Sequence, residues 1–98
     1  MLTKFVIVEL NDGLNSKTIE KFIDLSSRFT SSIILSKRGQ EANAKNSMEL
    51  LALSIRKSEE LTIKVDGFDQ IEAIEKIYRF LTNEVKKWML SWFFFGFL

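Results

Sequence analysis

The side chains that most often carry out catalysis or bind metals are missing from this sequence. Its 98 residues contain no histidine and no cysteine. This removes the commonest general acid–base group, phosphohistidine chemistry, the thiol nucleophile and thiolate metal ligands. Catalysis would need paired carboxylates or an activated lysine, and no acidic pair is set in an obvious pocket. We therefore expect no enzyme activity, no cofactor and no metal site.

The first cluster of polar side chains that could recognise a partner precedes a predicted helix. Residues 11–13 read Asn-Asp-Gly, a combination that favours a tight turn. Asn15 or Ser16 can then cap a helix whose apolar residues recur at helical spacing. Its buried face is expected to hold Ile19, Phe22 and Ile23, with Ser26, while Lys17, Lys21 and Asp24 face water.

The second cluster opens another predicted helix, over residues 47–55. Ser47 is expected to be its cap, and the segment holds the apolar residues Met48, Leu50, Leu51, Leu53 and Ile55. A helix this short and this apolar does not stand alone in water. It must pack against another element, so simple burial is the competing interpretation for Met48, Leu50 and Leu51.

Strands and a third helix must position these two helix starts. We predict strands over residues 2–10, 32–36, 41–43 and 61–65, the third being short and polar and therefore at a sheet edge. A capping box at Asp69 and Glu72 should begin the last helix. Its apolar stripe is Ile71, Ile74, Tyr78, Leu81 and Val85.

The predicted order of elements is strand, helix, strand, strand, helix, strand, helix. Helices that each carry an apolar stripe must share one face of a largely antiparallel sheet. The fold class is therefore α+β: an open-faced β-sandwich in which three helices cover one face of a four-stranded antiparallel sheet.

Composition limits the class of protein further. A chain of 98 residues, 46% hydrophobic, fits one domain, which we place at residues 1–87 with a tail at 88–98. The 14 basic and 13 acidic residues are interspersed, which argues against a nucleic-acid partner. No apolar run follows the first residues, so we expect no secretory signal and a cytoplasmic location.

The elements and three short motifs resemble the HPr family, the phosphocarriers of the bacterial sugar phosphotransferase system. The motifs are Asp-Gly-Leu at 12–14, Asn-Ala-Lys at 43–45 and Val-Asp-Gly at 65–67, each ahead of a predicted helix. The resemblance covers residues 1 to about 85. It implies the fold described above and, in the family, phosphate relay through one histidine.

The position of the phosphorylated histidine is Asn15 in this chain. The family places that histidine after a glycine and an aliphatic residue and before a small residue, an arginine and a proline; residues 13–18 here read Gly-Leu-Asn-Ser-Lys-Thr. An amide nitrogen is not nucleophilic, so Asn15 cannot hold a transferable phosphoryl group. Lys17 replaces the arginine and lacks the planar guanidinium group that forms two hydrogen bonds to a phosphate. Thr18 replaces the proline.

The family's regulatory serine directly follows the Asn-Ala-Lys motif, which places Asn46 at that position. Ser47 lies one residue later, and this shift turns its hydroxyl by about 100° around the helix. Ser47 as a displaced phosphoacceptor, giving a serine-phosphorylated regulator, stays open as an alternative.

The resemblance implies a protein-binding surface at the first two helix starts. In this chain it comprises Asn15, Lys17, Asn46, Ser47, Met48 and Leu51. Asp24 and Glu49 now lie on its rim, where acidic side chains would repel the acidic partners of the family. We expect a regulatory or protein-binding module with a changed protein partner, one of the phosphotransferase system or a regulatory protein.

The tail is not explained by the resemblance. It holds Trp88, Trp92, Phe93, Phe94 and Phe95, and Lys86 and Lys87 precede it. As a helix its eleven residues would be about 16 Å long, half of the roughly 30 Å of bilayer hydrocarbon. Aromatic rings and lysines favour peripheral membrane contact, which makes a membrane-associated or scaffolding module the alternative function. The alternatives are that the tail folds back over an exposed apolar face, mediates oligomerisation, or has no role.

Overall fold

The computed structural model describes residues 1–82. Its four strands form one antiparallel sheet in the order β1-β4-β2-β3. Their bounds are β1 Leu2–Ile7, β2 Ser32–Lys37, β3 Gln40–Asn43 and β4 Glu60–Asp66. The polar strand β3 lies at an edge of the sheet, as its composition predicts.

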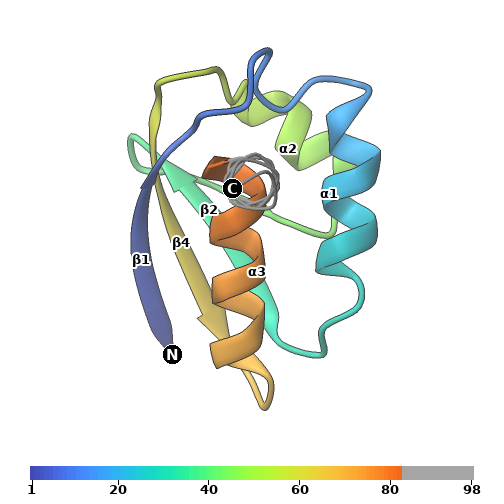
Figure 1. The fold of residues 1–98 in the computed structure, drawn as a ribbon, viewed down its shortest axis with the longest axis vertical. Helices are drawn as coiled ribbons and strands as arrows, with labels where there is room; N and C mark the ends of the chain where they lie inside the picture. The colour runs from blue at the N-terminus through green and yellow to red at the C-terminus, as the bar shows by residue number, and fades with distance from the viewer. Residues whose placement is uncertain (83–98) are drawn as a thin grey trace, which may run out of the picture.

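Three helices cover one face of this sheet (Figure 1). They are α1 Thr18–Ser26, α2 Ser47–Leu53 and α3 Gln70–Thr82. Helix α3 packs on β1 and β4, α2 packs on β3, and α1 lies beside the other two helices. The predicted open-faced sandwich is confirmed.

The core lies between the sheet and the helices. Strand β4 alternates strictly, with Leu61, Ile63 and Val65 buried toward the helices, because successive side chains of a strand point to opposite faces. On the helical side, the rings of Phe22 in α1 and Phe80 in α3 lie 5.3 Å apart. The other face of the sheet is not covered by any helix within residues 1–82.

Two elements are shorter than predicted. Strand β1 ends at Ile7 rather than at residue 10, although Val8 is still buried. Helix α2 ends at Leu53 because Ser54 adopts a left-handed conformation with φ of 51°. Ile55 is buried beyond the end of the helix.

The predicted start of α3 is wrong in two respects. The Asp69 carboxylate does not cap the first turn with Glu72; it accepts hydrogen bonds from the backbone N–H groups of Thr30 at 2.9 Å and Ser31 at 3.0 Å, and from the Ser31 hydroxyl. Ile71 is 73% exposed, because the buried stripe runs along Ala73, Ile77 and Leu81. Val85 lies outside the described residues.

Candidate functional site

Asn15 is the centre of the hydrogen-bond network that starts α1. Its side-chain Oδ1 accepts from the backbone N–H groups of Lys17 at 2.8 Å and Thr18 at 3.1 Å. The N–H of Asn15 donates to Thr18 Oγ1 at 2.9 Å, and its carbonyl accepts from the N–H of Ile19 at 2.9 Å. Of the two predicted caps, Asn15 is therefore the one used.

The loop before Asn15 is fixed against the segment that follows α2. The N–H of Leu14 donates to the carbonyl of Ile55 at 3.0 Å. Gly13 has φ of 63°, and a Cβ atom at this position would lie 2.3 Å from the same carbonyl oxygen. Glycine is required here both by the backbone conformation and by the space. The start of α1 is thus joined to the end of α2, and Figure 1 shows the two helices side by side.

At the start of α2 the cap is Asn46 and not Ser47. The Asn46 side chain accepts a hydrogen bond from the N–H of Glu49 at 3.2 Å, from an extended backbone conformation. Ser47 is the first residue of the helix, and its side chain is exposed. The predicted capping role of Ser47 is wrong because its backbone is already helical, whereas a cap requires a non-helical residue.

Met48 and Leu51 lie on the outer face of α2. Met48 is 79% exposed and Leu51 is 50% exposed, whereas Leu50 and Leu53 are buried in the core. Residues three apart share one face of a helix, so Met48 and Leu51 form one apolar patch. Burial of Met48 and Leu51 is contradicted by the structure; burial of Leu50 is confirmed.

The predicted rim residues Asp24 and Glu49, and Lys45 ahead of α2, each have an ion-pair or hydrogen-bond partner. Asp24 faces Arg28 at 3.4 Å, and Glu49 Oε1 accepts from the N–H of Asn43 at 3.2 Å. The Lys45 ammonium group donates to the carbonyls of Phe29 at 2.7 Å and Ser31 at 3.0 Å. Lys17, by contrast, is exposed at the start of α1.

A lysine in the hairpin between β2 and β3 supports the far end of α2. Lys37 Nζ lies 2.7 Å from the carbonyl of Ser54 and 3.1 Å from Glu59 Oε1. A cation at a helix C-terminus is stabilising. The hydrogen bond from Lys37, joined by one from the N–H of Arg56, holds the pKa of Glu59 below its ordinary value of 4.5.

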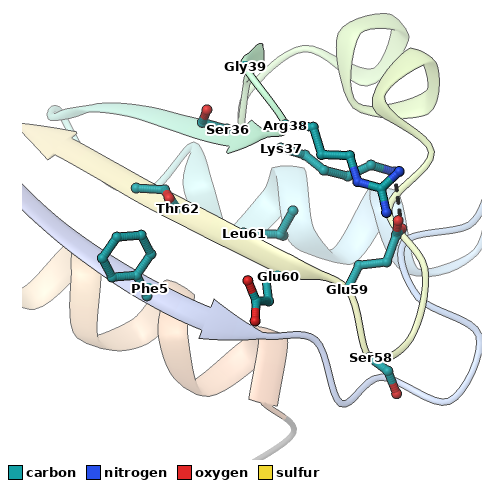
Figure 2. A pocket seen from close by; sticks show the side chains of 10 residues that line it. All are labelled: Phe5, Ser36, Lys37, Arg38, Gly39, Ser58, Glu59, Glu60, Leu61 and Thr62. Carbon is teal, nitrogen blue, oxygen red and sulfur yellow. Dashed lines mark hydrogen bonds and ion pairs between the residues drawn. The ribbon is translucent and has the colours of Figure 1, made fainter.

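This support could not be predicted from the sequence, because Lys37 and Glu59 are 22 residues apart and neither lies in a motif. The ion pair borders a hollow of about 560 Å³ at the hairpin end of the sheet. Figure 2 shows this hollow, which is lined by Phe5 of β1, Thr62 of β4 and Ser36 of β2 among others.

Trp88, Trp92, Phe93, Phe94 and Phe95 all lie outside the described residues. Within residues 1–82, no helix has the length and apolar character needed to cross a membrane.

Comparison with known proteins identifies the family. The family model for the phosphotransferase-system HPr component phosphorylation site matches residues 2–83. The HPr-like protein Crh of Bacillus subtilis is 35% identical over 85 residues, covering 87% of this chain and all of the relative. The phosphocarrier protein HPr of Xylella fastidiosa is 29% identical and covers 85% of this chain and 93% of its own length.

Solved structures agree with this result. The crystal structure of HPr from Bacillus anthracis superposes with a TM-score of 0.80 at 31% identity, covering 82% of this chain and 95% of that one. A crystal structure of Bacillus subtilis Crh, described as a swapped, intertwined dimer, gives a TM-score of 0.70 at 34% identity, covering 86% and 97%. The chain belongs to the HPr family, and it is a member whose sequence contains no histidine.

Proposed function

We propose that this protein is an HPr-like regulatory module that binds a protein partner without relaying phosphate through a histidine. The observation that carries the proposal is the exposed apolar pair Met48 and Leu51, held on a short helix beside the start of α1. Exposed apolar side chains that share one face are typical of interaction sites. Methionine in particular adapts to the shape of a partner.

The chemistry at Asn15 supports the absence of relay. An amide nitrogen has no free lone pair with which to accept a phosphoryl group. The Asn15 side-chain oxygen is also engaged, since it accepts two backbone hydrogen bonds. At the start of α1, a partner would therefore contact the exposed charge of Lys17 and the capped loop.

The exposed charges on and near α1 and α2 favour a partner whose surface is not purely acidic. Lys17 is exposed just before α1, Lys21 and Asp24 are exposed on α1, and Glu49 is exposed on α2. Mixed charge favours a partner with both signs, because charge complementarity selects among partners. The similarity to Crh, described as a catabolite repression protein, supports a regulatory role.

The proposal is tested by comparing two exposed apolar surfaces of the same molecule. Full-length protein with Met48→Ser and Leu51→Ser is used beside wild type to capture partners from the source cells. The matched control carries Phe68→Ser and Ile71→Ser. These replace two exposed apolar residues, one in the loop before α3 and one in its first turn. We expect the first variant to lose a partner that wild type and the control retain. Equal retention by all three proteins would contradict the proposal.

A second candidate function is regulation by phosphorylation of Ser47. The observation that favours it is the exposed position of Ser47 at the first residue of α2, where the helix dipole stabilises added negative charge. Incubation with ATP and the serine kinase that acts on HPr proteins should then give a phosphoryl adduct that the Ser47→Ala variant does not form. An adduct on both proteins, or on neither, would exclude Ser47 as the acceptor.

A further inference from the structure

A hollow of about 480 Å³ runs along the outer edge of the sheet, away from the α1 and α2 surface. One wall is formed by Phe5, Ile7 and Glu60, and the other by Tyr78 and Thr82 of α3. Within the described part of the chain, β1 has only one neighbouring strand, β4. The hollow therefore combines a sheet edge, part of the uncovered sheet face and the last turn of α3.

The apolar side chains in this hollow are unusually exposed. Phe5 is 79% exposed and Ile7 is 55% exposed, and they point to the same face because they are two residues apart in a strand. Phe5 and Glu60 also border the hollow beside the hairpin between β2 and β3, which Figure 2 shows. Phe5 thus borders both hollows.

The chain leaves the described structure at the rim of this hollow. Thr82 is the last described residue and is itself part of the wall. The end of α3 is fixed there by a hydrogen bond of 2.9 Å from the N–H of Glu9 to the carbonyl of Leu81. A linker of five residues, 83–87, spans at most about 17 Å, and Thr82 and Phe5 line the same hollow, so residue 88 is tethered close to it.

The segment that follows is complementary to the hollow in both apolar character and charge. Residues 88–98 include two tryptophans and four phenylalanines, which favour burial. Lys86 and Lys87 precede them, and the carboxylates of Glu9 and Glu60 border the hollow. The two lysines would therefore lie near the carboxylate of Glu60 at the point where the aromatic segment enters.

We propose that the C-terminal aromatic segment, residues 88–98, docks within its own chain into this hollow and covers Phe5 and Ile7. The tether makes this contact intramolecular, so its effective concentration is in the range of about millimolar for a short linker. That favours the segment of the same chain over that of a second molecule. Docking closes the open edge of the sheet and leaves the surface around Met48 and Leu51 free.

Tryptophan fluorescence tests this directly, because both tryptophans of the protein, Trp88 and Trp92, lie in the segment. For the full-length wild type we expect blue-shifted emission and weak quenching by acrylamide, both independent of protein concentration. Phe5→Ser should shift the emission to the red and raise the quenching constant severalfold. Ile7→Ser should act in the same direction, and far-UV circular dichroism confirms that each variant is folded.

The matched control is Phe68→Ser, since Phe68 is fully exposed in the loop before α3 and does not line the hollow. It should leave emission and quenching unchanged. Solvent-like emission of the wild type, or emission that responds to neither Phe5→Ser nor Ile7→Ser, would overturn the proposal. A blue shift that grows with protein concentration would assign the segment to a second copy. One that appears only with anionic vesicles would assign it to a membrane.

Charge reversal tests the role of the rim. Glu60→Lys should weaken docking and shift the emission to the red. Adding Lys86→Glu and Lys87→Glu to the same chain should restore the blue-shifted emission. Failure of the charge swap to restore it would contradict the proposed pairing of the lysines with the acidic rim.

Discussion

The starts of α1 and α2 are built from the same residue type but differ in how much they leave exposed. Asn15 accepts two backbone hydrogen bonds, and the loop before it is fixed to the carbonyl of Ile55. Asn46 accepts one, at 3.2 Å, and the residues after it, Ser47 and Met48, are exposed. The sequence motifs predict that both positions correspond to phosphorylated residues of the HPr family.

The two helix starts therefore differ in the side chains that they present at the surface. At α1 the side-chain oxygen of Asn15 is engaged in hydrogen bonds to the backbone N–H groups of Lys17 and Thr18. At α2 the cap precedes an apolar patch, Met48 and Leu51, that is exposed. Substitutions on the α1 side should therefore reduce stability, and substitutions on the α2 patch should reduce binding.

Among substitutions at the two helix starts, Gly13→Ala is expected to have the largest effect on stability. The left-handed backbone costs a non-glycine residue about 1–2 kcal/mol, and the clash with the Ile55 carbonyl adds about 1–3 kcal/mol as the loop is displaced. We expect a loss of about 3 kcal/mol in the free energy of unfolding, measured by urea denaturation.

Gly39→Ala is the control for Gly13→Ala. Gly39 also has positive φ, 82°, but a Cβ atom there meets nothing within 4 Å. Its loss should be confined to about 1–2 kcal/mol. If the two variants lost the same stability, the α1 loop would not be fixed as tightly as the structure indicates.

Removing each cap compares the two helix starts directly. Replacing an asparagine cap by alanine costs about 0.5–2 kcal/mol in general. We expect Asn15→Ala to lie near the upper end of this range and Asn46→Ala near the lower end, because Asn15 accepts two hydrogen bonds and Asn46 one. Thermal and urea unfolding of both variants measure the difference, and the reverse order would contradict the proposed division of roles.

Acid should loosen the end of α2 before the start of α1. The hydrogen bond from Lys37 lowers the pKa of Glu59, so the unfolded chain binds more protons there than the folded one. The stability that Glu59 contributes is therefore present above pH 4.5 and is lost as the pH falls through its lower folded-state pKa. Amide hydrogen exchange should accelerate first around residues 54–59. Earlier exchange at residues 15–19 would show that the Asn15 network is the weaker one.

The smallest effect on stability is expected on the exposed patch itself. Met48→Ser should change the free energy of unfolding by no more than about 0.5 kcal/mol, as for most surface substitutions. Leu50→Ala, on the buried face of the same helix, should cost about 2–5 kcal/mol. Differential scanning calorimetry of both variants checks this, and a large loss for Met48→Ser would mean that its side chain supports the fold.

Local patterns were enough to predict most of the fold. The alternation in β4, the helical spacing of Ile19 and Phe22, and the polar composition of β3 each follow from a short segment. The structure departs from prediction where distant residues decide the outcome. Asp69 binds Thr30 and Ser31, 38 or 39 residues away, instead of capping its own helix.

The site was predicted less completely than the fold. The resemblance located Asn15 and Asn46, and the sequence favoured an asparagine or serine at each cap. Which residue caps α2 depends on where the backbone becomes helical, and the local pattern did not distinguish Asn46 from Ser47. Exposure of Met48 and burial of Leu50 depend on the side of α2 that meets the sheet, which the short apolar segment left open.

The most direct test of the account is a phosphorylation measurement on the full-length protein. It is incubated with phosphoenolpyruvate and the general phosphotransferase enzyme, with the HPr of Xylella fastidiosa as a positive control, and both masses are determined under conditions that preserve phosphohistidine. The account predicts an adduct on the control and an unchanged mass for this protein. A phosphoryl adduct on this protein would contradict the proposal that it is a binding module that does not relay phosphate.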